Sequence, residues 1–175
     1  MTKDKSEVVD ASGSLWEFSL AIYESKAVQN ACLCLQDRHG LDVNILLLCC
    51  WLAKRGERID SREIDVVLAR TTEWQDTVIV PLRGIRRHMK AGIRPIPIKD
   101  SEVLRARLKV LELEAERIEQ QQLESTVLHG MELASGGSNR SELSMTNLTA
   151  YFSALQIESS KRDVQDLKTL ADKIG

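Results

Sequence analysis

Residues 43–55 form the segment that most restricts how this chain can fold. Apolar residues occupy nearly every position, and their run from Ile45 to Ala53 is unbroken. Asp42 precedes the segment as a favourable N-cap, and Gly56 follows it as a favourable left-handed C-cap. A helix that is apolar all round lies inside a soluble bundle rather than on its surface. The unbroken run is about half as long as the roughly 20 residues that a membrane-spanning helix needs, so we expect a core helix.

Two helices are predicted before this core helix. Ser14 and Glu17 have the spacing of a capping box and open a first, short helix that reaches about residue 24. The second helix covers about residues 27–39, because its apolar residues recur at helical spacing. Gly40 stands where a left-handed C-cap would end it.

Two further helices are predicted after the core helix. Asp60 opens the first of them at capping-box spacing, and Thr71 or Thr72 is expected to cap the second. An interior proline costs about 3 kcal/mol and can break a helix. The apolar residues nevertheless keep one helical phase across Pro81, so we expect one kinked helix. These residues are Trp74, Val78, Leu82, Ile85 and Met89.

Residues 14–94 are thus predicted to form the core of a helical bundle, after a disordered N-terminus at residues 1–13. Pro95 and Pro97 push the residues before them out of the helical region, so this segment marks a boundary. Residues 99–134 then follow as a long amphipathic helix.

That helix would be about 50 Å long at 1.5 Å per residue, whereas a compact chain of this size has a diameter of roughly 40 Å. We therefore expect it to project, to bend or to pack against a second copy. Its apolar residues Leu104, Leu108, Leu111, Ala115 and Ile118 alternate steps of four and three.

The chain is predicted to close with a flexible loop at residues 135–141 and a C-terminal helical pair at residues 142–175. This pair would pack on the core or on a second copy. No segment alternates apolar and polar residues as a half-buried strand does. The predicted fold class is therefore all-α: a helical bundle with a long amphipathic helix and a C-terminal helical pair.

The cysteines predict no chemistry. Cys32, Cys34, Cys49 and Cys50 lie in apolar runs, and their spacings direct neighbouring side chains to different helix faces. We expect buried free thiols in a cytoplasmic protein, without disulfide or metal. The N-terminal residues lack the apolar region of a secretion signal. No catalytic constellation and no cofactor motif is evident, so we expect a non-enzymatic protein without cofactors, and no membrane association.

The main charge feature lies between residues 77 and 94, which contain five Arg and Lys residues and no Asp or Glu. Arg83, Arg86, Arg87 and Lys90 recur at i, i+3, i+4 and i+7 and so share one helix face. Because arginine forks suit phosphate and carboxylate, this face is a candidate surface for an anion or a partner.

Two other interpretations of this face stay open: solvation, and pairing with the acidic run of Glu112, Glu114, Glu116 and Glu119, within the chain or between subunits. A net charge of −2 and an aromatic content of 4% argue against nucleic acid. A local basic patch can still suffice for such binding.

A polar turn at residues 36–44 is the second candidate site. Gly40 and Asp42 are explained as helix caps. Gln36, Asp37 and Asn44 are less readily explained, because they border the most buried helix and must be hydrogen-bonded if they are buried. Two interpretations stay open: a structural network between helices, or a ligand pocket formed by Gln36, Asp37, Asp42 and Asn44.

Five short blocks of the sequence are distinctive: LWEF at 15–18, CLCLQD at 32–37, GLDVN at 40–44, WLA at 51–53, and PLR with RR at 81–87. With these blocks the chain resembles a family of small uncharacterised proteins from Gram-negative proteobacteria, most closely over residues 14–89. The resemblance implies a bacterial, cytoplasmic helical domain of unknown function. Its recurring polar positions are Gln36, Asp37, Asp42, Asn44, Arg83, Arg86 and Arg87.

Two functional hypotheses follow. The leading one is a helical interaction or adaptor protein, whose basic face meets an acidic protein or an RNA-rich assembly, or which forms a homo-oligomer. The alternative is a binder of, or a small enzyme acting on, an anionic, phosphorylated small molecule. In that case, Asp37 and Asn44 would orient a ligand held by Arg83 and Arg87 in a pocket between the second, third and fifth helices.

Overall fold

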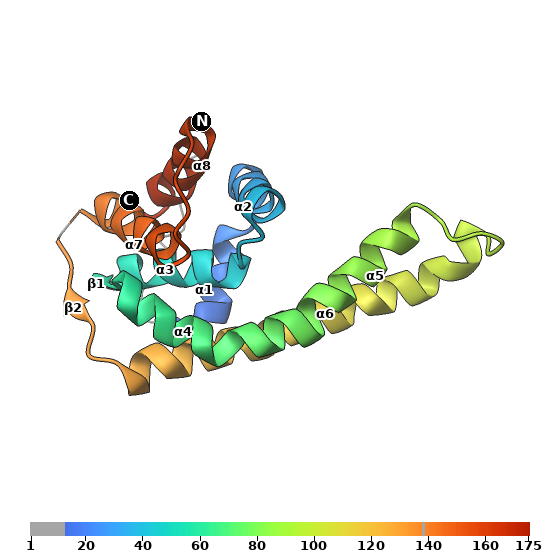
Figure 1. Cartoon of the computed structure of the whole chain (residues 1–175), viewed down its shortest axis with the longest axis horizontal. Coiled ribbons are helices and arrows are strands. Elements are labelled where there is room, and N and C mark those ends of the chain that lie inside the picture. The colour runs from blue at the N-terminus through green and yellow to red at the C-terminus, as the bar shows by residue number, and fades with distance from the viewer. Residues whose placement is uncertain (1–12, 138) are drawn as a thin grey trace, which may run out of the picture.

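A computed structural model describes residues 13–137 and 139–175 and confirms the all-α fold class (Figure 1). A π-helical segment, η1 (Gln75–Ile79), joins α4 directly to α5, and two short strands, β1 (Glu57–Arg58) and β2 (Ala134–Ser135), pair antiparallel. The predicted disordered N-terminus lies outside the described residues except for Gly13. The α-helices are α1 (Leu15–Ile22), α2 (Lys26–His39), α3 (Val43–Arg55), α4 (Ser61–Trp74), α5 (Val80–Lys90), α6 (Ile98–Gly130), α7 (Arg140–Ala154) and α8 (Lys161–Asp172).

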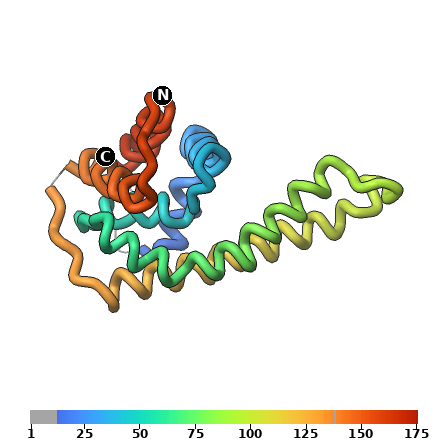
Figure 2. Tube along the Cα trace, viewed as in Figure 1, coloured from blue at the N-terminus to red at the C-terminus, as the bar shows by residue number. Residues whose placement is uncertain are grey.

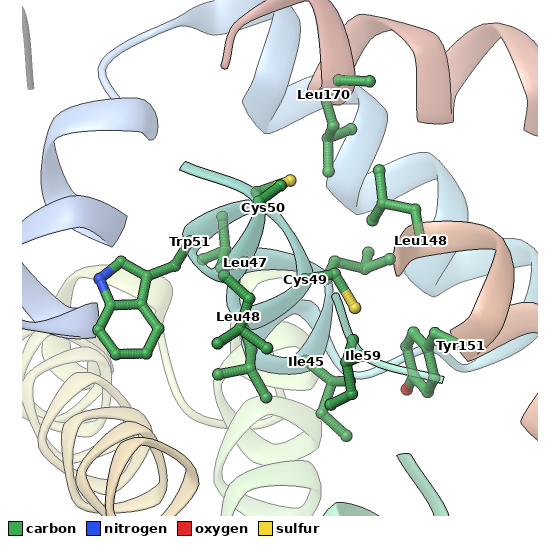
Figure 3. Close-up of a cluster of buried hydrophobic side chains, with 14 of the residues drawn as sticks. Ile45, Leu47, Leu48, Cys49, Cys50, Trp51, Ile59, Leu148, Tyr151 and Leu170 are labelled. Atoms are coloured by element: carbon green, nitrogen blue, oxygen red, sulfur yellow. The ribbon is translucent and has the colours of Figure 1, made fainter. Parts of the chain in front are cut away.

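Helix α3 lies at the centre of the bundle, as its apolar sequence predicts. Every residue from Asn44 to Ala53 is buried. Figure 3 shows Trp51 on one side of α3, and Leu148 and Tyr151 of α7 on the other. The indole Nε1 of Trp51 donates to the carbonyl oxygen of Gly13 at 3.1 Å. Gly13 is therefore held against the core, contrary to its predicted place in the disordered N-terminus.

The predicted helix ends around this core are confirmed. Gly40 and Gly56 have φ angles of 68° and 85°, a region that glycine enters without steric cost. The carboxylate of Asp42 accepts the backbone N–H of Asn44 at 2.8 Å and so caps α3. Both predicted capping boxes, at the starts of α1 and α4, are also present.

Helices α4 and α5 form one unbroken rod with η1, so the predicted cap at Thr71 or Thr72 is wrong. The hydroxyls of Thr71 and Thr72 donate to the carbonyl oxygens of Val67 and Leu68, one turn earlier, at 3.2 and 2.8 Å. These bonds satisfy the hydroxyls inside a continuing helix rather than at its start. Pro81 lies in the first turn of α5, directly after η1.

The π-helical segment also changes which residues of the rod are buried. Its turns contain more residues than those of an α-helix, so the helical phase shifts across it. Ile79 and Met89 are buried, whereas Ile85 is 51% exposed. The shift makes Ile79 the buried residue in place of the predicted Val78. The predicted apolar face is also wrong at Ile85, which follows η1 together with Met89 and faces solvent.

Helices α5 and α6 pack antiparallel and form a hairpin that projects from the bundle (Figures 1 and 2). Pro95 and Pro97 lie in the turn at its far end, where Ile93 and Ile96 form a β-bridge. The indole Nε1 of Trp74 donates to the carbonyl oxygen of Ala115 at 3.1 Å and ties the rod to α6. Projection is one of the three outcomes that the length of the helix predicts.

Helix α6 ends at Gly130, before its predicted end at residue 134. The chain then enters strand β2, which pairs with β1. Glu57 pairs with Ser135, and the backbone N–H of Gly136 donates to the carbonyl oxygen of Gly56 at 2.8 Å. These bonds satisfy backbone groups of the linker that a free loop would leave to water. The prediction of a flexible loop at residues 135–141 is therefore wrong at its start.

Helices α7 and α8 form the predicted C-terminal pair and dock on the core. Helix α7 packs along α3, and α8 packs on α2 and α7. Asn147 of α7 is fully buried: its Nδ2 donates to the carbonyl oxygens of Cys49 and Glu57 at 3.2 and 3.0 Å, and its Oδ1 accepts the N–H of Ile59 at 3.1 Å. This side chain holds the link between α3 and α4 in place.

Candidate ligand-binding pocket

A cavity of about 300 Å³ lies where the hairpin meets the bundle. Helices α1, α2, α3, α5 and α6 all contribute to its wall. The apolar part of the wall consists of Trp16, Leu20, Leu33, Val43, Leu47 and Leu113, and the polar part consists of Ser19, Tyr23, Gln36, Asn44, Arg83, Arg86, Arg87, Lys109, Glu112, Glu116 and Gln120.

The spacing of these residues explains why they converge. Residues three and four apart on a helix share one face. Helix α1 contributes positions 16, 19 and 20, its C-cap Tyr23 follows on the same face, and α5 contributes positions 83, 86 and 87. Helix α6 contributes positions 109, 112, 113, 116 and 120 along one flank. Each helix thus turns one side toward the cavity: α1, α2 and α3 bring apolar and uncharged polar residues, α5 brings arginines, and α6 brings both apolar and charged residues.

Much of the predicted basic face is paired with the acidic residues of α6. Arg83 donates from Nε to Glu112 at 3.0 Å and from Nη2 to Glu116 at 2.8 Å. Arg86 donates to both carboxylate oxygens of Glu112. The Arg83 and Arg86 side chains are 14% and 24% exposed. Internal pairing, one of the open interpretations, thus describes these two arginines.

The other cationic side chains of this region, Arg87, Lys109 and Lys90, are more exposed to solvent. Arg87 donates to Asp37 at 3.1 Å, and the two side chains are 48% and 58% exposed. Lys109 is exposed at the cavity and has no ion-pair partner within residues 13–137 and 139–175. Lys90 is exposed on α5 and does not line the cavity. Of the predicted basic face, Arg83 and Arg86 are thus paired with α6, Arg87 is exposed at the cavity, and Lys90 faces solvent away from it.

The two carboxylates of the cavity have opposite pKa shifts. Burial alone would raise the pKa of Glu112, but its hydrogen bonds from Arg86 and Arg83 outweigh this and hold the pKa below its ordinary value. Burial raises the pKa of Glu116, and Arg83 offsets only part of that effect. Four cationic side chains line the cavity with two carboxylates, and Asp37 pairs with Arg87 from outside it, so positive charges outnumber negative ones.

A buried polar network lies behind the cavity wall. The side chain of Asn44 donates from Nδ2 to Glu119 and accepts at Oδ1 from Nε2 of Gln120 at 2.8 Å. The backbone N–H of Asp42 donates to the hydroxyl oxygen of Tyr151 at 3.0 Å. Asn44 thus takes part in the interhelix network that was one interpretation of the polar turn.

Asp42 and Glu119 form a carboxyl pair within this network. Burial raises the pKa of both groups, and the nearby charge of Asp42 raises that of Glu119 further. Two neighbouring carboxylates disfavour each other's charged form, so we expect one of them to hold a proton. Glu119, whose pKa is raised to about 8 by burial and by Asp42, is that group.

Three polar atoms of the cavity wall lack a hydrogen-bond partner in the described part of the protein: Ser19 Oγ, Gln36 Nε2 and Gln120 Oε1. Ser19 and Gln120 are only 4% and 2% exposed. A buried polar group without a partner costs about 1–3 kcal/mol, and most such groups in native proteins are satisfied. All three atoms belong to residues of the cavity wall, but the atoms themselves are buried, so they reach a bound molecule only if their side chains reorient.

The structure thus brings together some of the predicted pocket residues and separates others. Gln36 and Asn44 line the cavity, whereas Asp37 lies outside it, paired with Arg87, and Asp42 is buried behind its wall. Sequence reasoning missed Ser19 and Gln120. The available signals were a serine on the apolar face of α1 and the glutamines at positions 120–122, which interrupt the apolar pattern of α6.

In the described part of the chain, the cysteines and His39 do not gather into another site. Cys34 is exposed, contrary to the prediction that all four thiols are buried. His39 is bonded through Nε2 to Asp163 at 2.9 Å and packs edge-on against Phe152. Within the described ranges, no three His, Cys, Asp or Glu side chains form a group suited to a metal ion. None of the helices found there has both the length and the apolar character to cross a membrane.

Comparison with known families adds one finding. A family described as "protein of unknown function (DUF2390)" matches residues 14–123, and the chain therefore belongs to it. The matched region contains every residue that lines the cavity, from Trp16 to Gln120, and stops before α7 and α8. Comparisons with curated proteins and with solved structures find no match.

Proposed function

We propose that this member of a family without an assigned function binds a small molecule that has an anionic group and an apolar body. The observation that carries the proposal is a cavity of about 300 Å³ whose wall joins apolar side chains to the exposed cations Arg87 and Lys109. Pockets with mostly apolar walls and a few convergent polar groups are typical ligand sites. A volume of about 300 Å³ lies at the small end of that class and favours a compact ligand.

Each part of the wall has a distinct role in this proposal. Arg87 and Lys109 are the open cations of the cavity and meet the anionic group. Arg83 and Arg86 are engaged by Glu112 and Glu116, so they hold the hairpin and the charge of the site in place. The apolar side chains of α1, α2 and α3 contact the apolar body.

The pocket explains the arginines better than a basic docking surface does. An acidic protein or an RNA would have to compete with Glu112 and Glu116 for Arg83 and Arg86. Breaking a partly buried ion pair leaves an uncompensated charge, which is costly. A small anion at Arg87 and Lys109 leaves those pairs intact.

We place this binding in the bacterial cytoplasm. The four cysteines are free thiols, three of them buried in the core. Free cysteines are typical of proteins that work in a reducing compartment.

A melting-shift screen tests the proposal. Aliphatic and aromatic carboxylates and phosphomonoesters are added singly to the full chain, and the unfolding temperature is measured. A ligand at 100 times its dissociation constant adds about 2.7 kcal/mol of stability. We expect a saturable shift with at least one such compound, and its loss in the double variant Arg87→Ala/Lys109→Ala. Because the Arg87 and Lys109 side chains are exposed to solvent, the variant without ligand should have the same unfolding temperature as the wild type.

The variant Lys90→Ala/Arg94→Ala is the matched control, since it removes two exposed cations of the hairpin that do not line the cavity. It should keep the full shift. A panel without any saturable shift, or equal losses in both double variants, would contradict the proposal.

A further inference from the structure

One flank of the projecting hairpin is apolar and open. Arg86 of α5 bonds Glu112 of α6, so these two residues face each other across the hairpin. Arg87 and Leu113 follow them and line the cavity on one flank. Successive residues of an α-helix are rotated by about 100°. Ile85 and Leu111, which precede the facing pair, therefore lie on the opposite flank, away from the cavity and the bundle.

An apolar stripe runs along this opposite flank of α6. Leu104, Leu111 and Ile118 recur every seven residues and are 56%, 49% and 51% exposed. Ile85 of α5, at 51%, lies beside them. The sequence pattern of α6 is thus only partly used within one chain, because Ala115 packs against the rod and the stripe does not. Large exposed apolar side chains that recur along one face of a soluble protein mark a candidate interaction surface.

We propose that this stripe is the interface of a homodimer, in which α6 packs antiparallel against α6 of a second copy. A repeat of seven residues is the spacing that keeps one helix face against another helix. A two-fold axis gives both copies the same contacts. If the axis passes beside Leu111, Leu104 lies opposite Ile118 of the partner subunit, and the stripe is continuous on both copies.

Charge complementarity selects the antiparallel arrangement. Arg107 and Glu114 are exposed beside the stripe, and neither has an ion-pair partner elsewhere in the described residues. In the antiparallel arrangement, Arg107 comes within one residue of Glu114 of the partner subunit, and the pair occurs twice. A parallel arrangement would set Arg107 beside Arg107 of the partner subunit. The charges thus favour a second copy of this chain in one orientation.

The stripe from Leu104 to Ile118 is about 21 Å long at 1.5 Å per residue. An interface of this length falls among small and reversible protein contacts. We therefore expect a dimer that dissociates on dilution, with a dissociation constant in the micromolar range.

Sedimentation velocity over a concentration series tests the dimer with the full chain. The wild type should shift from monomer to dimer as concentration rises. Leu111→Glu places a charge at the centre of the stripe and should weaken the dimer about 100-fold. Val164→Glu is the matched control, because Val164 is a 44% exposed apolar residue on α8, and it should dimerise as the wild type does. A wild type that stays monomeric throughout, or a Leu111→Glu variant that dimerises normally, overturns the proposal.

Charge reversal tests the orientation. Arg107→Glu and Glu114→Arg should each weaken the homodimer, because each sets like charges against one another at two places. An equimolar mixture of the two variants should form a heterodimer, in which every such pair is again of opposite sign. Circular dichroism of each variant checks that the exposed substitution leaves the helices intact. A mixture that remains monomeric would exclude the antiparallel arrangement. Neither experiment depends on a ligand in the cavity, so its result is separate from that of the melting-shift screen.

Discussion

Glu119 is 1% exposed on α6, beside Asp42 at the start of α3. Its Oε2 accepts a hydrogen bond from Asn44, and its raised pKa keeps it protonated where an ordinary glutamate is ionised. Asn44 lies in the polar turn that the sequence marks as unusual. Its partners Glu119 and Gln120 lie more than 70 residues away in the chain. Sequence spacing shows local caps such as Asp42, but it does not show contacts between distant helices.

The raised pKa of Glu119 predicts how stability changes with pH. An unfolded glutamate releases its proton near pH 4.3. The folded protein keeps the proton, so the contribution of Glu119 is full below that value and declines as pH rises toward the folded pKa. Glu119→Gln cannot ionise and retains an acceptor for Asn44. It should therefore melt as the wild type does in acid and be more stable by about 2 kcal/mol near pH 8.

Thermal unfolding between mildly acidic and mildly alkaline pH measures this difference. Glu73→Gln replaces an exposed glutamate of α4 and serves as the control, with a pH profile like that of the wild type. A Glu119→Gln variant that follows the wild-type profile at every pH would show that the carboxyl group does not hold its proton.

At the scale of the elements, the hydrophobic pattern predicts helices well and their junctions poorly. The all-round apolar sequence of α3 is enough to place it in the core. The junction at Gln75–Ile79 depends on how the rod packs against α6, and no local signal shows that its turn is π-helical. The strand pair is equally hard to predict from local sequence, because Glu57 and Ser135 are too far apart in the chain for any short pattern to connect them.

Asn147 shows how much one such junction contributes to the free energy of unfolding. It holds the backbone between α3 and α4 through hydrogen bonds to Cys49, Glu57 and Ile59. Asn147→Ala removes all three hydrogen bonds and leaves the buried N–H of Ile59 without its partner, so we expect a loss of about 2–4 kcal/mol. Urea unfolding followed by circular dichroism measures the loss. Thr146→Ala, which removes an exposed hydroxyl of the same helix, should change stability by less than about 0.5 kcal/mol.

At the scale of the whole molecule, α8 closes the bundle against α2. The carboxylate of Asp163 is buried at the N-terminus of α8 and accepts hydrogen bonds from Ser160, Arg38 and His39. Burial alone would raise its pKa, but the hydrogen bonds from Ser160 and His39 outweigh this and hold the pKa well below its ordinary value. The sequence predicts the helical pair, but the pattern of α8 does not reveal that an aspartate in its first turn is buried.

Asp163→Asn removes the charge and one acceptor while keeping the size of the side chain. The depressed pKa means that the contribution of Asp163 is full above the ordinary aspartate value near 3.9 and is lost as pH falls toward the folded pKa. At neutral pH the variant should therefore be less stable by about 3 kcal/mol, because Arg38 and His39 both lose their carboxylate acceptor. The difference from the wild type should shrink as the solution becomes more acidic than about pH 4.

Asp166→Asn is the control for this prediction. It alters the more exposed partner of Arg38 and should cost no more than about 1 kcal/mol. Equal losses in the two variants, or a loss at Asp163 that does not diminish in acid, would show that this carboxylate does not hold α8 against α2.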